Sequence, residues 1–228
     1  HDIRVTLSDT VKILNIIPNY KSFIETIQEY DYKISTRQKR YFLDIVNKET
    51  NRLTRLVNDI LCISKLDSIQ NVCLESIDLI ETFTQTKLNY QITARDKNLY
   101  LHSELIFNNL TVKGNKDLLL QVLTNLVGNA LKFTYGGGEI IIRAYQIGSF
   151  KKARLRVEIV DTGIGIIDNY QQEIFQRFYR IENNVHTLKG TGLGLSISKT
   201  ILLQHNTTIN VISRFNVGSI FWFDLLIG

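Results

Sequence analysis

The clearest periodic pattern in the chain is an apolar stripe that repeats at alternating intervals of three and four residues. Its members are Phe42, Val46, Leu53, Leu56, Ile60 and Ile63, with the polar Glu49 in the remaining position. This spacing predicts a long helix with a coiled-coil-like seam. A less regular helix is expected before a polar turn at residues 31–35, and Pro18 would kink or interrupt it. A lone hairpin with such a seam would expose apolar surface, so we expect a homodimer built on a four-helix bundle.

After Ser68 the pattern changes to short strands and helices. Strands are expected near residues 72–77, 99–105, 139–145, 154–160, 208–213 and 219–226, and helices near residues 117–133 and 193–205, with one more ending near residue 95. Helices segregated from mostly adjacent strands favour an α/β sandwich with the helices on one face. We therefore predict an α+β protein with a helical-hairpin dimerisation domain at residues 1–68 and an α/β sandwich domain at residues 72–228.

Composition and charge narrow the class of protein. With 44% hydrophobic and 21% charged residues, a chain of 228 residues can bury a core of one or two domains. The net charge of +5 is spread over scattered Lys and Arg, so nucleic acid is not an expected partner. No apolar run approaches the roughly 18 residues of a membrane span, and any membrane anchor is expected upstream of this chain. The spacing of Cys62 and Cys73 fits neither a metal nor a redox motif, so free thiols in a reducing compartment are expected.

A glycine turn directly follows the predicted strand at residues 154–160. It reads Asp161-Thr162-Gly163-Ile164-Gly165-Ile166. A carboxylate at a strand end can accept a hydrogen bond from an exocyclic amine, and glycines let the backbone approach a flat ring or a phosphate. In isolation the same residues also fit an ordinary turn.

A second glycine motif leads into an apolar helix. It reads Gly190-Thr191-Gly192-Leu193-Gly194-Leu195. Backbone amides at such a turn, together with the helix N-terminus, favour phosphate oxygens. No Gly-Lys-Ser/Thr follows, and no strand is expected directly before it, so the motif is neither a Walker loop nor a Rossmann fingerprint.

Two asparagines lie four residues apart in the predicted helix at residues 117–133. Asn125 and Asn129 therefore share one helix face, where a side-chain oxygen could reach a magnesium ion that bridges phosphates. Lys132 is close enough in sequence to offer a positive charge to the same anion. Alone, this segment also fits a helix with two polar positions.

The order of these segments carries the interpretation. An asparagine helix, an Asp-x-Gly-x-Gly turn, Phe175-Gln176-Arg177-Phe178 and a Gly-x-Gly-x-Gly turn resemble the N, G1, F and G2 boxes of the histidine-kinase ATPase domain, in the superfamily shared with gyrase, Hsp90 and MutL. The resemblance covers roughly residues 72–228. It implies that the chain binds ATP with Mg²⁺.

The resemblance also assigns roles to residues. Asp161 would read the adenine amine and Asn129 would hold magnesium, while residues 167–189 would form a lid over the nucleotide. These kinases often have a further glycine at the position of Lys189. The lysine in its place would stiffen the lid. The residues implied in nucleotide binding are Asn125, Asn129, Lys132, Asp161, Gly163, Gly165, Ile166, Phe175, Phe178, Lys189, Gly190, Thr191, Gly192, Leu193 and Gly194.

The N-terminal part resembles the dimerisation and phosphoacceptor domain of the same kinases. The segment at residues 48–67 is similar to its second helix, and with residues 22–31 it looks most like the cyanobacterial and algal-plastid branch. This implies a response regulator receiver domain as partner. It also implies a location in an algal plastid (chloroplast), or otherwise on the cytoplasmic side of a bacterial membrane.

The phosphoacceptor is expected at the start of the chain. The first seven residues, His1-Asp2-Ile3-Arg4-Val5-Thr6-Leu7, are similar to the family pattern His-Glu/Asp-Leu/Ile-Arg-Thr-Pro-Leu. On this interpretation the imidazole of His1 attacks the γ-phosphate and Asp2 accepts the ring proton. In these kinases the polar residue four positions after the histidine holds the water that removes phosphate from the partner regulator. The Val5 side chain cannot hydrogen-bond a water, so phosphatase activity is not expected. The remaining histidines, His102, His186 and His205, are expected to be surface or packing residues.

The spacing after His1 leaves an alternative open. His1 precedes Phe23 by about twice the family's usual interval, an excess of about three helical turns, which keeps the core-facing side but changes the height along the bundle. The expected function is therefore a sensor histidine kinase core that autophosphorylates from Mg-ATP and transfers the phosphoryl group to a regulator aspartate. The main alternative is an ATP-binding scaffold without autokinase activity. An ATP-driven clamp like gyrase or MutL fits the long seam poorly.

Overall fold

The computed structural model describes residues 34–68, 72–106, 111–148, 153–181 and 190–228, together with Glu25 and Gln28. The chain divides into two compact units. The first holds α3 (Thr36–Ser68) up to Ser64 together with residues 190–191, and the second holds the described residues from Lys65 onward apart from those two. The predicted phosphoacceptor pair, His1 and Asp2, lies outside the described residues, as do Pro18, His186 and Lys189.

Helix α3 is the long helix that the apolar seam predicts. Its start is a capping box, in which the Gln38 amide donates to Ser35 Oγ (3.3 Å) and the Ser35 amide donates to Gln38 Oε1 (2.9 Å). Lys65 lies in the last turn, where a positive charge is favourable. Leu56 and Ile63 are buried, and the other seam positions are half-buried. The seam residues therefore lie on the covered side of the helix.

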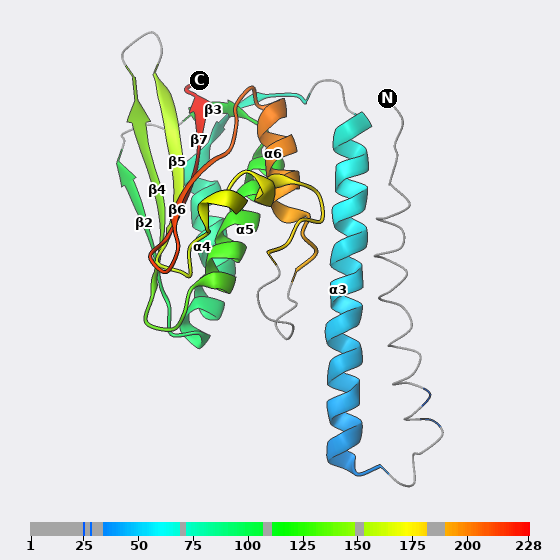
Figure 1. The fold of residues 1–228 in the computed structure, drawn as a ribbon. Coiled ribbons are helices and arrows are strands. Elements are labelled where there is room, and N and C mark those ends of the chain that lie inside the picture. The colour runs from blue at the N-terminus through cyan, green and yellow to red at the C-terminus, as the bar shows by residue number, and fades with distance from the viewer. Residues whose placement is uncertain are drawn as a thin grey trace. The chain divides into compact units, whose positions relative to one another are not determined.

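The second unit is a sheet with helices on one face, as the sequence predicts (Figure 1). Its described strands follow the order β2-β4-β5-β7-β6. The bounds are β2 (Tyr100–Ile106), β4 (Glu139–Ile147), β5 (Arg154–Asp161), β6 (Asn210–Arg214) and β7 (Gly218–Leu226). Helices α4 (Leu79–Asp96), α5 (Lys116–Phe133) and α6 (Gly194–Gln204) cover one face. Among these described strands, only the β2–β4 pairing is parallel.

Strand alternation separates the two faces of the sheet. Ile142, Ile159 and Phe221 are neighbours on adjacent strands and are buried. The other face carries ion pairs, in which Arg143 contacts Glu104 at 2.7 Å and Arg156 contacts Asp224 at 2.8 Å. Burial of alternate residues and pairing of the charged ones are what a half-covered sheet requires.

A small second sheet consists of one strand that the sequence predicts and one that it does not. Strand β1 (Glu75–Asp78) lies near the predicted residues 72–77, but its partner β3 (Thr111–Gly114) has no counterpart among the predicted strands. Four residues are too few to show a period, and β3 is defined instead by tertiary pairing of the fully buried Val112 with Ile77. Among the described helices, none combines the length and apolar character needed to cross a membrane.

Two of the three remaining histidines can be placed. His205 is buried, its Nε2 accepts from the Asn115 amide (3.0 Å) and its Nδ1 faces the Ile201 carbonyl (2.7 Å), so it joins the start of α5 to the end of α6. Burial lowers the pKa of His205, which keeps the ring neutral. His102 lies on the charged face of the sheet beside Glu104 and Glu139. Both positions agree with the predicted packing and surface roles.

Candidate nucleotide-binding site

Asp161 is the last residue of β5, and its carboxylate is buried at 8% exposure. Its Oδ1 accepts from the Gly163 amide at 2.9 Å, and Ser219, its register partner on β7, also donates to it. Burial raises the pKa of Asp161, while these hydrogen bonds act in the opposite direction. The result is a fixed, poorly solvated acceptor at the end of a strand.

The turn after Asp161 packs its backbone tightly against two other elements. A Cβ on Gly163 would lie 2.6 Å from the Phe133 carbonyl oxygen at the end of α5. Gly165 has a φ of +65°, and its Cβ would lie 2.0 Å from the Arg214 carbonyl oxygen. The Ile164 amide donates to Phe133 O (3.1 Å) and the Ile166 amide to Ser213 Oγ (2.7 Å). These positions require glycine because the backbone itself fills the space.

The two asparagines of α5 have different surroundings. The Asn125 amide nitrogen donates to Gly194 O (3.1 Å) and Ser198 Oγ (3.4 Å), which ties α5 to the first turns of α6. Asn129, one turn later, is half-buried, and its side chain makes no hydrogen bond with the described residues. Asn125 therefore serves to join elements, whereas the Asn129 oxygen remains available as a ligand for a hard cation.

A second positive charge lies near Lys132. Burial, and then the positive charge of Arg180, lower the pKa of Lys132 to about 8. The Lys132 Nζ also lies 4.4 Å from the Phe133 ring centroid. Two like charges held together in a partly buried place destabilise each other, and an anion between them would relieve that repulsion. The arrangement fits a polyphosphate.

The second glycine motif is divided between the two units. Gly192, Leu193 and Gly194 belong to the second unit, and α6 begins at Gly194 with no side-chain cap among the described residues. Its first amides are therefore available for an anion. Gly190 and Thr191 group with the first unit, where the Thr191 hydroxyl donates to Asp59 Oδ2 at 2.7 Å.

The Phe175–Phe178 segment anchors the described start of the predicted lid. The Phe175 ring meets Phe221 edge-on at 6.4 Å between centroids. Phe178 adopts a φ of 61°, uncommon for a bulky residue, and its amide donates to Gly192 O at 3.0 Å. A Cβ on Gly192 would touch the Phe178 backbone at 3.0 Å, so this contact also requires glycine.

Sequence reasoning missed three residues of this region. Ser219 and Ser213 face each other at 3.0 Å between their hydroxyl oxygens, and together they support Asp161 and the Ile166 amide. Arg180 adds the second cation. The strand register that places Ser219 opposite Asp161 has no signal in the sequence, whereas the position of Arg180, two residues after Phe178, could have drawn attention.

Within the second unit these segments adjoin one another, beginning at the C-terminal half of α5. Gly163 and Ile164 contact its last residue, Gly194 contacts Asn125, and Phe178 is joined to Gly192. A buried carboxylate acceptor, an uncapped helix N-terminus, paired cations and an amide oxygen suit the amine, phosphates and metal of a Mg-nucleotide.

Comparison with known sequences identifies the family. Residues 114–227 match the family described as histidine kinase-, DNA gyrase B- and HSP90-like ATPase. The chain belongs to this ATPase family. Relatives include the sensor-like histidine kinase ycf26 of Pyropia yezoensis, which is 49% identical over 92% of this chain and 33% of its own length. Drug sensory protein A of Synechocystis is also 49% identical, over 92% of this chain and 32% of its own length. The chain thus spans about a third of these relatives.

Solved structures of histidine kinases share the fold. The catalytic domain of ThkA is 27% identical with a TM-score of 0.59, covering 68% of this chain and 95% of that one. ThkA in complex with the response regulator TrrA has a TM-score of 0.77 at 24% identity over 99% of this chain and 62% of that one. ShkA in complex with AMPPNP has a TM-score of 0.70 at 24% identity over 87% and 41%. The predicted resemblance to sensor histidine kinases is confirmed.

Proposed function

We propose that the chain is the catalytic core of a sensor histidine kinase that uses Mg-ATP to phosphorylate a histidine. One observation carries the proposal: parts of all four motif segments adjoin one another within the second unit. The Asp161 turn contacts Phe133 at the end of α5, Asn125 of α5 is bonded to Gly194, and Phe178 is bonded to Gly192. Its membership of the ATPase family and its sensor kinase relatives support the same activity.

Different described residues would bind the adenine, the phosphates and the Mg²⁺ ion. The Asp161 carboxylate would accept a hydrogen bond from the exocyclic amine of adenine. The first amides of α6, with Lys132 and Arg180, would hold the phosphates, and the Asn129 oxygen would hold Mg²⁺. Bound Mg²⁺ neutralises phosphate charge, and ATP supplies the γ-phosphoryl group.

The transfer itself is assigned to the N-terminal segment. The neutral imidazole nitrogen of His1 would bond to the γ-phosphorus as the bond to the β,γ-bridging oxygen breaks, releasing ADP, and Asp2 would accept the ring proton. A receiver-domain aspartate of a response regulator would then take the phosphoryl group from the histidine. The regulator bound to ThkA in its complex supports this choice of partner.

Labelling tests the proposal directly. Protein incubated with γ-labelled ATP should acquire an acid-labile, base-stable label that His1→Gln abolishes while ATP binding remains. Label that persists in His1→Gln would assign the acceptor to another histidine. ATP binding without label in the wild type would favour the ATP-binding scaffold instead.

We further propose that the chain forms a homodimer through its helical hairpin, residues 1–68, with residues 72–228 as the ATP-binding domain. Besides the seam, α3 carries a second stripe, Leu43, Val57 and Leu61, whose exposures are 58%, 52% and 53%. Each of these residues follows a seam residue, about 100° around the helix. A helix in a four-helix bundle contacts two neighbours and needs such a widened apolar face.

A plastid location in an alga is also proposed, based on the similarity to ycf26 of Pyropia yezoensis. The equal identity to a Synechocystis protein supports a bacterial cell as the alternative location.

A further inference from the structure

The last turn of α3 belongs to the second unit, although the helix itself runs on without a break from the first. The division falls between Ser64 and Lys65, inside Thr36–Ser68. Residues 65–68 are therefore the part of α3 that packs with the second unit.

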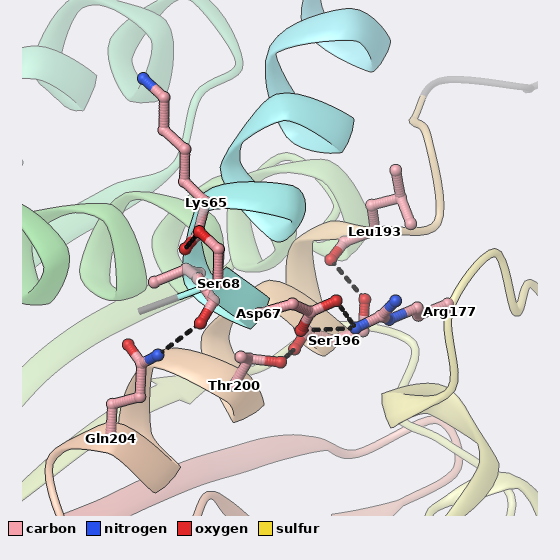
Figure 2. Close-up of polar contacts among 9 residues, drawn as sticks. Lys65, Asp67, Ser68, Arg177, Leu193, Ser196, Thr200 and Gln204 are labelled. Carbon is pink, nitrogen blue, oxygen red and sulfur yellow. Dashed lines mark hydrogen bonds and ion pairs between the residues drawn. The ribbon is translucent and has the colours of Figure 1, made fainter. Parts of the chain in front are cut away.

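Three contacts fix this turn within the second unit (Figure 2). Leu66 is buried at 4% exposure, and its carbonyl accepts a hydrogen bond from Gln204 Nε2 of α6 at 2.7 Å. That carbonyl lies in the last turn of α3, where no further helical amide is available to it. Asp67 then meets Arg177, whose Nη2 donates to both carboxylate oxygens, at 3.1 and 3.0 Å.

Arg177 lies in the lid base, which we define as residues 175–178. Its neighbours there are fixed to the second unit by the Phe175–Phe221 ring contact and the Phe178–Gly192 hydrogen bond. The φ of 61° at Phe178 stores backbone strain that surrounding contacts must hold. The ion pair is thus an added restraint on a strained segment beside the second glycine motif.

We propose that Asp67 is a positioning residue that acts through Arg177 to hold the lid base against Gly192. The proposal rests on the proposed nucleotide site, since it assigns the lid its role there.

The alternative is that the Asp67–Arg177 ion pair is an ordinary surface contact that does not affect the lid base. Both side chains are partly exposed, at 48% for Arg177 and 38% for Asp67, and exposed pairs contribute little to stability. A readout local to the lid base is therefore needed. The Phe178 amide provides it, because its hydrogen bond to Gly192 O breaks whenever the base opens.

The test compares Asp67→Asn with Glu81→Gln in the full chain. Glu81 forms a similar exposed ion pair with Lys116 (2.7 Å) between α4 and α5, away from the lid base, which makes it the matched control. Hydrogen exchange of the Phe178 amide without nucleotide should quicken about two- to fivefold in Asp67→Asn and stay unchanged in Glu81→Gln. The KM for ATP should rise by a similar factor with kcat changed less.

A charge swap completes the test. Asp67→Arg combined with Arg177→Asp should restore both the Phe178 exchange rate and the KM, because the pair re-forms with reversed polarity. Equal exchange in Asp67→Asn and wild type, or a swap that restores neither readout, would overturn the proposal. The exchange measurement needs no nucleotide, so a chain that fails to bind ATP would refute the proposed function and leave this result separately interpretable.

Discussion

We expect nucleotide recognition to depend most on Asp161. Asp161→Asn keeps the size of the side chain but replaces a charged acceptor with a neutral amide, and charge-assisted hydrogen bonds are the stronger ones. We expect the Kd for ATP, measured by isothermal titration, to rise about tenfold or more. The same exchange at the exposed Asp96, the last residue of α4, should leave the Kd unchanged. Equal affinity in wild type and Asp161→Asn would place adenine recognition elsewhere.

We expect Lys132 to make the affinity for ATP depend on pH. Its pKa of about 8 means that the free protein loses this positive charge as the pH rises through that value. Bound phosphate favours the charged lysine and raises its pKa, so affinity is full below about pH 8 and falls above it, by at most about tenfold per pH unit.

The control for this dependence is Lys132→Arg, because guanidinium stays charged over the whole range. Its Kd should be nearly constant from about pH 7 to about pH 9.5, where the wild type weakens. Parallel profiles for the two proteins would show that Lys132 does not face the phosphates.

At the residue scale, the sequence predicted those site residues that stand in short local motifs. Asp161, Asn129 and the glycines stand in short patterns whose chemistry can be reasoned from spacing alone. Ser219 and Arg180 could not be found in that way, because strand register places one and tertiary proximity to Lys132 the other. Asn125 was expected beside the nucleotide, and the structure shows it joining α5 to α6.

At the scale of elements, the turn after β5 depends on backbone packing that only glycine allows. Gly165→Ala would keep the unfavourable φ of +65° and also place a Cβ 2.0 Å from the Arg214 carbonyl oxygen. Gly137 offers a matched control, since its φ is +88° and a Cβ added there would meet nothing within 4 Å. Gly137→Ala should cost about 1–2 kcal/mol, and Gly165→Ala clearly more, as measured by thermal unfolding. Equal costs would mean that the Gly165 turn can shift freely.

Element prediction succeeded where the pattern was long and failed where it was short. The periodic stripe predicted α3, and alternation predicted β4, β5 and β7 to within a few residues. Strand β3 was missed because it consists of four residues whose identity as a strand comes from pairing with β1 and from the burial of Val112. Pairing between distant segments is a property of the fold that local periodicity does not contain.

At the scale of the whole molecule, the homodimer can be tested on the second stripe of α3. Val57→Asp combined with Leu61→Asp would place two unpaired charges in the proposed interface, and burying them would oppose association strongly. Light scattering after size-exclusion chromatography should then report a monomer where the wild type is a dimer.

The control for the dimer must carry a new charge on an equally exposed apolar position elsewhere. Ile92 of α4 is 70% exposed and lies in the second unit, so Ile92→Asp should leave the dimer intact. Val57 and Leu61 are already half-exposed in the single chain, so their replacement should also leave ATP binding by the second unit unchanged. A double variant that binds ATP and remains dimeric would show that these residues lie outside the interface, whereas one that binds ATP as a monomer would show that the stripe holds the two copies together.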